Sequence, residues 1–294
     1  MKQPIFTGAC TALVTPFAEN GLDYSAFFRL LDRQIQAKIG AVVVCGTTGE
    51  ASTMTDQEQQ ALISACVQRA NHACRVIAGT GTNDTAHAVR KSKAAADAGA
   101  DALLVVTPYY NKCSKTGLIR HYEAIADAVH IPVILYNVPS RTGVSMTPEQ
   151  YAILAQHPNI VGVKEAGGST AQVSRTIALC GPEFSVWSGN DDQIVSIMAL
   201  GGQGVISVLS NLAPELVQEI ASLCQRGDYP QAAQLQNTYM DLIDALFCEV
   251  NPIPIKEALR LKGLLDSRCR LPLNQISTEG KLQLTRAMIH HGLL

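Results

Sequence analysis

Short runs rich in β-branched residues recur along the chain, and they constrain its fold more than any other feature. The runs cover residues 9–14, 41–45, 75–79, 102–107, 132–136, 160–164, 184–188 and 204–208. Stretches with helical patterns separate them, so each run and the stretch after it form a strand–helix unit. Eight such units favour a closed (β/α)₈ TIM barrel over an open doubly wound sheet.

Helix start signals agree with this division. Asp23 precedes an apolar stripe that stops at Gly40, and residues 55–58 (Thr-Asp-Gln-Glu) have the pattern of a capping box. Thr147 followed by Pro148 places a cap before a proline in the first helical turn. These signals predict helices at the expected places between strands.

The alternation of strands and helices stops after a helix expected at 214–225. Residues 226–230 (Arg-Gly-Asp-Tyr-Pro) are typical of a connecting segment, and the sequence beyond them has only helical patterns. We therefore predict a catalytic barrel at 1–227 and a C-terminal helical module at 228–294.

Composition limits the classes of partner. The chain has 294 residues, 47% of them hydrophobic and 16% charged, with a formal net charge of -2. This is typical of a compact globular protein, and without a basic stripe nucleic acid is a poor candidate partner. No apolar run approaches the roughly 18 residues of a membrane span, and the start lacks the apolar core of a signal peptide. We expect a cytoplasmic protein that acts on small molecules.

Nine cysteines are scattered without a C-x-x-C motif, which predicts free thiols and neither a disulfide framework nor a metal site. Cys45 ends a strand but has no partner histidine that would make it a nucleophile. The segment 79–84 (Gly-Thr-Gly-Thr-Asn-Asp) follows the third strand and lacks a third glycine, so a dinucleotide site is not expected there.

Lys164 ends an apolar run at the rim where barrel enzymes carry their active sites. Alternation along the strand predicts Ile160, Gly162 and Lys164 on one face and Val161 and Val163 on the other. An amine that enters a dry cavity in this way can attack a ketone and form a Schiff base. The alternative is a structural lysine whose ammonium reaches Glu165 or solvent.

Tyr136 ends the preceding strand, so its phenol can meet the amine, and Thr47 and Tyr110 at other strand ends offer hydroxyls to pass a proton. Tyrosines packed at the rim are the alternative. Arg141, five residues beyond Tyr136, suits a carboxylate, and the turn at 47–49 can present amides to a second one. For Arg141 the alternative is a solvated surface position.

Five segments together resemble the dihydrodipicolinate synthase family. They are residues 8–17 (GACTALVTPF), 46–50 (GTTGE), 136–143 (YNVPSRTG), 162–165 (GVKE) and 251–256 (NPIPIK), and the resemblance spans nearly the whole chain. Within the wider superfamily of pyruvate-dependent class I aldolases, sialic acid lyases share the GTTGE and lysine positions but generally lack the arginine at position 141. Arg141 therefore carries much of the assignment.

The resemblance implies a lyase that condenses pyruvate with L-aspartate 4-semialdehyde to 4-hydroxy-tetrahydrodipicolinate, in diaminopimelate and lysine biosynthesis. Lys164 would form the Schiff base, Tyr136 would move protons, and Thr47 would link it to Tyr110 of a neighbouring subunit. The remaining contacts would be Thr48 with the pyruvate carboxylate, Gly189 and Ile206 through their main chains, and Arg141 with the semialdehyde carboxylate. The resemblance also implies a homotetramer, a dimer of dimers, and no metal or organic cofactor.

The family's feedback site for lysine corresponds here to Ala51, Ser52, Asp56, Gln59, Asn83, His87 and Tyr109. Strongly inhibited members tend to have two histidines and a glutamate at positions 56, 59 and 87. Without that glutamate a counter-charge for the lysine amino group is missing, so we expect weak or absent inhibition.

Two other functions compete with this one. Another pyruvate-dependent aldolase, acting on a sialic or sugar-derived keto acid, would not need Arg141. A non-catalytic barrel that binds a metabolite would be expected to lose the amine or its proton relay, and both are present in the sequence.

Overall fold

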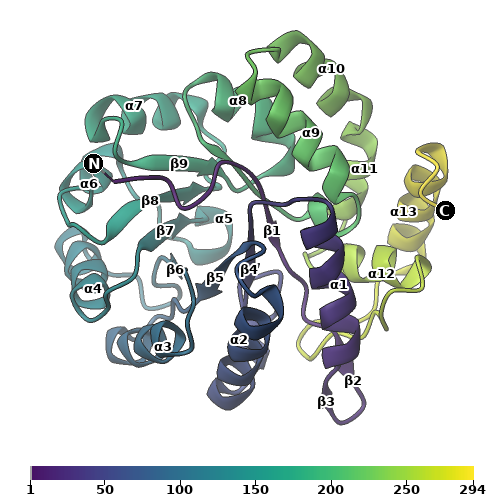
Figure 1. The fold of residues 1–294 in the computed structure, drawn as a ribbon, viewed down its shortest axis with the longest axis horizontal. Coiled ribbons are helices and arrows are strands. Elements are labelled where there is room, and N and C mark those ends of the chain that lie inside the picture. The colour runs from purple at the N-terminus through teal and green to yellow at the C-terminus, as the bar shows by residue number, and fades with distance from the viewer. Residues whose placement is uncertain (1) are drawn as a thin grey trace.

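The computed structural model of the protein describes residues 2–294, in which eight parallel strands close into a barrel (Figure 1). The strands are β1 (Gly8–Ala12), β4 (Ala41–Val44), β5 (Arg75–Gly79), β6 (Ala102–Val106), β7 (Val133–Asn137), β8 (Ile160–Glu165), β9 (Ser185–Ser188) and β10 (Gly204–Ser207). Their order around the barrel is β1-β10-β9-β8-β7-β6-β5-β4, with β4 paired to β1. The predicted TIM barrel is confirmed.

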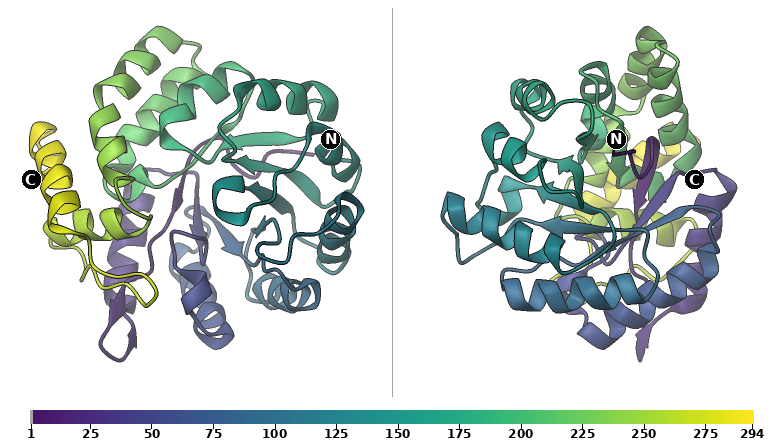
Figure 2. Two further views of the ribbon diagram at one scale, coloured as in Figure 1. Left: turned by 180° about the vertical axis from the view of Figure 1, so that it is seen from behind. Right: turned by 60° about the vertical axis from the view of Figure 1, so that its left-hand side comes forward.

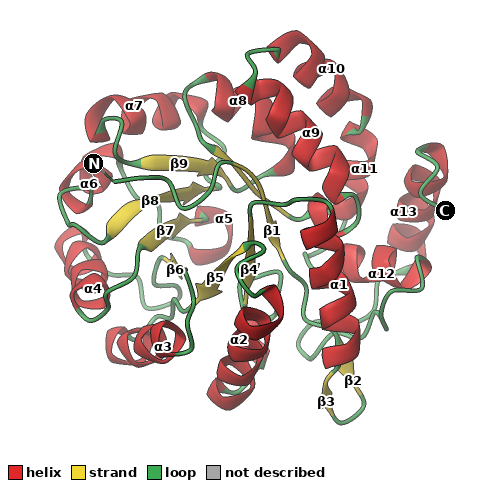
Figure 3. Ribbon diagram, viewed as in Figure 1, coloured by secondary structure: helices red, strands yellow, loops and turns green. Residues whose placement is uncertain are grey.

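Helices surround the strands, as the red and yellow ribbons of Figure 3 show. The helices of the barrel are α1 (Tyr24–Gln36), α2 (Asp56–Ala70), α3 (Thr85–Asp97), α4 (Lys115–Asp127), α5 (Pro139–Thr142), α6 (Pro148–Leu154), α7 (Thr170–Cys180), α8 (Ile194–Ala199) and α9 (Pro214–Gln225). Short 3₁₀ helices η1 (Ala51–Thr53), η2 (Asp191–Gln193) and η3 (Leu209–Asn211) follow three strand ends. Among residues 2–294, no helix combines the length and apolar character needed to cross a membrane.

The predicted helix caps are present. The Asp23 side chain accepts from the amide of Ala26 at the start of α1, and Thr55 and Glu58 form a reciprocal capping box on α2. Thr147 caps α6 ahead of Pro148. These local bonds satisfy amides that a helix leaves unpaired at its start, which is why they can be read from short sequence patterns.

A small hairpin between β1 and α1 was not predicted. It consists of β2 (Phe17–Ala18) and β3 (Gly21–Leu22), two antiparallel strands of two residues each. Strands this short carry no alternation to recognise. β1 itself ends at Ala12, earlier than the predicted run of 9–14.

An irregularity in β8 changes which of its side chains face the barrel interior. Consecutive residues of β7 pair with Ile160 and then Gly162, which leaves Val161 as an extra residue. Ile160 packs in the hydrophobic cluster outside the barrel, and Val161 packs in the one inside. The prediction that Ile160 shares a face with Lys164 is therefore wrong, because a one-residue bulge shifts the alternation.

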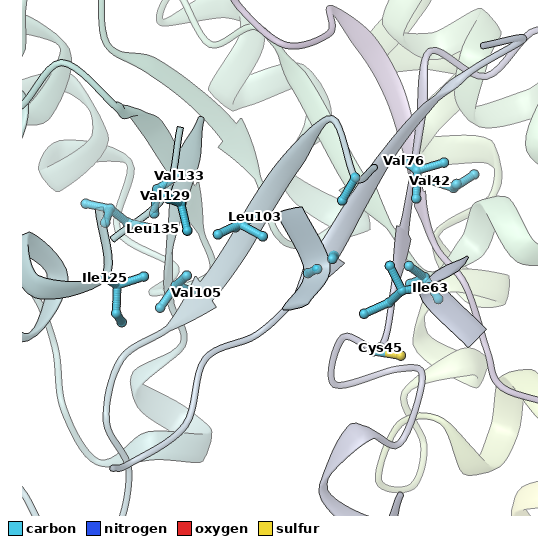
Figure 4. Close-up of a cluster of buried hydrophobic side chains, with 14 of the residues drawn as sticks. Val42, Cys45, Ile63, Val76, Leu103, Val105, Ile125, Val129, Val133 and Leu135 are labelled. Carbon is cyan, nitrogen blue, oxygen red and sulfur yellow. The ribbon is translucent and has the colours of Figure 1, made fainter. Parts of the chain in front are cut away.

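Two hydrophobic layers hold the barrel together. The outer layer lies between strands and helices and includes Val42, Val76, Leu103, Val133 and Leu135, shown with Ile125 and Val129 in Figure 4. The inner layer fills the barrel and is built from the alternate strand positions, such as Val43, Ile77, Leu104 and Ile134. The barrel is thus a packed core whose rim remains free for chemistry.

Four helices follow the barrel: α10 (Tyr229–Thr238), α11 (Met240–Leu246), α12 (Ile253–Leu261) and α13 (Thr278–His290). Figures 1 and 2 show α12 and α13 at the outer edge of the molecule, near α1 and α11. Their buried side chains share one hydrophobic cluster with β1, α1, α8 and α9. The helical character of this region is confirmed, while the division into domains at residue 228 stays a prediction.

Candidate active site

Lys164 and Tyr136 are neighbours across the β7–β8 pair. Their Cα atoms are partners in the strand register, and the Lys164 Nζ lies 4.4 Å from the centroid of the Tyr136 ring. The side chains are only 5% and 7% exposed, respectively. The sequence predicted that amine and phenol can meet, and the structure brings the two side chains together, with the amine against the face of the ring.

Gly189, just after β9, leaves room for the lysine side chain. A Cβ at this position would lie 3.1 Å from Lys164 Cε and 2.8 Å from the Cβ of Ala166. The Gly189 amide donates to the carbonyl of Glu165 at 2.7 Å, which holds the ends of β8 and β9 together. Ile206, on β10, is fully buried in the inner layer together with Tyr136.

Glu165 does not pair with Lys164. Its carboxylate accepts from Asn137 Nδ2 at 2.9 Å, the Tyr151 hydroxyl at 2.8 Å and the Gly167 amide at 2.7 Å. Burial raises the pKa of Glu165, and these hydrogen bonds act in the opposite direction. The part of the structural alternative in which Glu165 holds the Lys164 ammonium is therefore wrong.

Thr47 and Thr48 follow β4 in a tight turn and differ in exposure. Thr47 is exposed, whereas the buried Thr48 Oγ1 accepts from Asn251 Nδ2 at 2.9 Å. The carbonyl of Asn251 in turn accepts from Arg141 Nη2 at 3.2 Å. Asn251 therefore connects the two side chains that the resemblance assigns to the two carboxylates.

No site role was predicted for Asn251. It lies in the Asn-Pro-Ile-Pro segment, which contributes to the family resemblance. Its contacts with β4 and β7 loops cross more than 100 positions of the chain, and no local pattern can show such contacts.

A buried ion pair holds the other end of the Thr47–Thr48 turn. Glu50 Oε1 lies 2.7 Å from Lys256 Nζ, and both side chains are 0% exposed. Lys256 also donates to the carbonyls of Thr15 and Arg268, and Glu50 Oε2 accepts from the Arg270 amide. The turn is thus tied to α12 and to the segment that follows it.

Thr47, Tyr136 and Arg141 line a cavity of about 410 Å³. The same cavity is lined by all seven residues of the candidate lysine site: Ala51, Ser52, Asp56, Gln59, Asn83, His87 and Tyr109. Three of the candidate active-site residues thus share a cavity with the candidate effector residues, whereas Lys164, Thr48, Gly189 and Ile206 do not line it.

Several polar groups of the candidate effector residues already have partners. His87 Nε2 lies 2.8 Å from the Asp56 carboxylate, and Gln59 Nε2 donates to two backbone carbonyls. The Asn83 carbonyl accepts from Asn111, and Tyr109 is 36% exposed. At position 87 the cavity thus has an imidazole that pairs with Asp56.

Tyr110 has a different environment from the other candidate catalytic residues. Its side chain is 92% exposed and its backbone has a φ of 70°, in the left-handed region. This chain on its own therefore does not bury Tyr110 at the site. The relay from Tyr110 to Thr47 stays a prediction that requires a second subunit.

The cysteines are all unpaired, as predicted. Burial raises the pKa of the Cys45 thiol to about 12, which leaves almost no thiolate near neutral pH. Cys45 lines the cavity but is a poor nucleophile.

Asp241, His290 and His291 are potential metal ligands whose ligand atoms lie within 4.8 Å of one another. No sequence pattern links them, because 49 residues separate the aspartate from the first histidine. Both carboxylate oxygens are already paired, with His290 Nδ1 at 3.0 Å and His291 Nε2 at 2.7 Å. The group as it stands joins α11 to the end of α13.

Comparison with known proteins gives one consistent result. The model of the Dihydrodipicolinate synthetase family matches residues 5–291. The chain is 46% identical to 4-hydroxy-tetrahydrodipicolinate synthase of Acetivibrio thermocellus over 294 residues, 100% of both chains. It is 39% identical to the solved dihydrodipicolinate synthase of Thermotoga maritima, with a TM-score of 0.97 and coverage of 99% and 100%. A structure of the enzyme from Cyanidioschyzon merolae with lysine bound is 40% identical, with a TM-score of 0.96 and the same coverage.

Proposed function

The chain belongs to the Dihydrodipicolinate synthetase family, and from this premise we propose the reaction and the residues that carry it. It is a 4-hydroxy-tetrahydrodipicolinate synthase, a lyase that condenses pyruvate with L-aspartate 4-semialdehyde in diaminopimelate and lysine biosynthesis. The observation that supports this most directly is the buried amine of Lys164 against Tyr136, at the rim of the barrel.

Lys164 is the nucleophile. Its neutral amine attacks the ketone carbon of pyruvate, and the carbinolamine loses water to give an iminium ion. The iminium withdraws electrons, so the methyl group loses a proton and an enamine forms. The enamine carbon bonds to the aldehyde carbon of the second substrate. The amino group of that substrate then displaces Lys164 and closes the ring, and the lysine is released unchanged. Because Lys164 itself is the electron sink, the scheme needs no metal or organic cofactor.

Tyr136 moves the protons of these steps. It is the phenol next to the amine, and it lines the cavity together with Thr47. A proton shuttle needs a further group that accepts and returns the proton. We assign this role to Thr47 and to Tyr110 of a neighbouring subunit, within a homotetramer built as a dimer of dimers. A Tyr110→Phe variant should lose most of its activity, and a fully active isolated monomer would contradict the role.

The two carboxylates bind at Thr48 and Arg141. Thr48 and the amides of its turn receive the carboxylate of pyruvate, and the guanidinium of Arg141 receives that of the semialdehyde. Asn251 supports this division, since it contacts both residues and fixes the distance between them. Gly189 and Ile206 contribute main-chain contacts to the pocket around Lys164.

Lysine inhibits this enzyme weakly or not at all. The pairing of His87 with Asp56 supports this, because the imidazole offers no negative charge to the amino group of a lysine ligand. Steady-state assays with added L-lysine test it, and a His87→Glu variant should become more sensitive than the wild type. A micromolar inhibition constant for the wild type would contradict the prediction.

Borohydride trapping tests the function as a whole. With pyruvate present, reduction should leave a stable adduct on the peptide that contains Lys164, detectable by mass spectrometry. A Lys164→Arg variant should show none. An adduct on a different lysine, or none in the wild type, would refute the assignment. Comparing L-aspartate 4-semialdehyde with sugar aldehydes as second substrate separates this enzyme from related aldolases. We expect such a metabolic enzyme to be cytoplasmic.

A further inference from the structure

Asp191 is a buried acid that the reaction scheme above does not use. It begins η2, three residues after β9 ends, and its side chain is 2% exposed. Oδ2 accepts from the amides of Val208 at 3.0 Å and Leu209 at 2.9 Å, directly after β10. Within residues 2–294, Oδ1 has no hydrogen-bond partner although it is buried. A buried carboxylate with a free oxygen is costly unless a charge nearby compensates it.

Lys164 is the cation whose charge acts on Asp191. Asp191 lies two residues beyond Gly189, which is packed against Lys164 so closely that a Cβ there would lie 3.1 Å from Lys164 Cε. Burial raises the pKa of Asp191, while the Ser207 hydroxyl, the two amides and the positive charge of Lys164 act in the opposite direction. The Tyr136 ring lies against the Lys164 amine, and the charge of Lys164 also acts on the Cys10 thiol, whose pKa burial raises. Glu165, the neighbouring acid, is engaged with Asn137 and Tyr151.

We propose that Asp191 is a positioning residue for the Schiff base: its carboxylate stabilises the positive charge that Lys164 carries as an iminium ion. This inference rests on the proposed function, since it requires Lys164 to form the iminium. The hydrogen bonds from the amides of Val208 and Leu209 hold the Asp191 carboxylate in place while the positive charge on the Lys164 nitrogen forms and is lost. A fixed anion of this kind does not have to reorganise during the reaction, which makes it more effective than a mobile one.

The test measures how much pyruvate is needed for half-maximal borohydride trapping, in the full-length protein. Asp191→Asn keeps an oxygen for the two amides and removes only the charge, and Asp191→Ser is a second neutral variant. Asp192→Asn is the matched control, because Asp192 is the adjacent acid and its side chain is exposed. Thermal melts confirm that each variant is folded.

For half-maximal borohydride trapping, both Asp191 variants should need at least about tenfold more pyruvate than the wild type. An opposite charge nearby changes a protonation equilibrium by a factor of this size. Their KM for pyruvate should rise in parallel, with little change in the KM for the semialdehyde, whereas a general loosening of the fold would affect both. Asp192→Asn should match the wild type. A folded Asp191 variant within about twofold of the wild type would overturn the proposal, since a lost charge partner predicts far more. Absence of any adduct in the wild type would instead refute the role of Lys164.

Discussion

Replacing Lys256 with methionine removes the cationic half of an ion pair that has no contact with solvent. In the wild type, Lys256 Nζ lies 2.7 Å from Glu50 and donates to two carbonyls as well. Methionine has nearly the same length and shape, so the main change is the loss of charge and of three hydrogen bonds. The carboxylate of Glu50 would remain at 0% exposure with two uncharged partners, the Arg270 amide and the Cys269 thiol.

The expected loss in the free energy of unfolding is large because the charge of Glu50 stays buried. Removing a single partner from a buried pair costs about 3–5 kcal/mol. An unfolding entropy of about 2.1 cal/mol/K per residue amounts to about 0.6 kcal/mol/K for 294 residues. The melting temperature should therefore fall by about 5–8 °C. Because Glu50 closes the turn that holds Thr48, the KM for pyruvate should also rise.

Differential scanning fluorimetry and steady-state kinetics on matched variants test this reasoning. Arg226→Met breaks the surface pair with Glu219, whose side chains are 58% and 52% exposed, and should cost no more than about 1 kcal/mol. The double variant Glu50→Gln, Lys256→Met should be more stable than Lys256→Met alone, since neither charge is then left unpaired. A Lys256→Met protein that melts within about 2 °C of the wild type would refute the argument. So would a double variant that is no more stable than the single one.

Three further changes have defined outcomes. Gly189→Ala places a Cβ 3.1 Å from Lys164 Cε, so we expect a loss of about 1–3 kcal/mol in thermal melts and a reduced yield of borohydride adduct, and an unchanged yield would contradict the contact. Asn251→Ala removes the donor to Thr48 and should lower kcat/KM about tenfold, mainly through KM, whereas an effect confined to kcat would contradict a binding role. The hydrogen bond from Arg270 holds the pKa of Glu58 at about 2 against a usual 4.5, so the pair stabilises the fold above pH 4.5 and this contribution is lost as the pH falls toward 2. The side chains of Arg270 and Glu58 are 28% and 25% exposed, so the contribution is discounted for solvent screening. In denaturant titrations an Arg270→Met variant should lose about 1–2 kcal/mol less stability than the wild type over that pH range.

The alternation of apolar runs was sufficient to predict the barrel, because each run is a buried parallel strand and each must be followed by a helix that returns the chain. Short sequence patterns were likewise sufficient to predict the helix caps at Asp23, Thr55 and Thr147. It did not detect the bulge at Val161, since an extra residue in one strand is defined only by pairing with its neighbour.

Site residues could be predicted where a strand end and a motif coincide. Lys164 and Tyr136 end consecutive strands, so the parallel register places them side by side. The residues that hold the site lie elsewhere in the chain: Asn251 and Lys256 reach it from the C-terminal helices. Asp191 follows a strand end but carried no motif that the sequence analysis could use.

The amino-acid sequence by itself therefore determined the barrel, the rim on which the chemistry lies, and the amine that the family resemblance marks as reactive. These properties depend on side-chain period and on order along the chain, both of which are local. Only the tertiary structure decided that Glu165 is unavailable to Lys164, that Asn251 joins Thr48 to Arg141, and that Asp191 is held by the amides after β10. The physical reason is that partners of buried polar groups are chosen by three-dimensional proximity, across any distance in sequence.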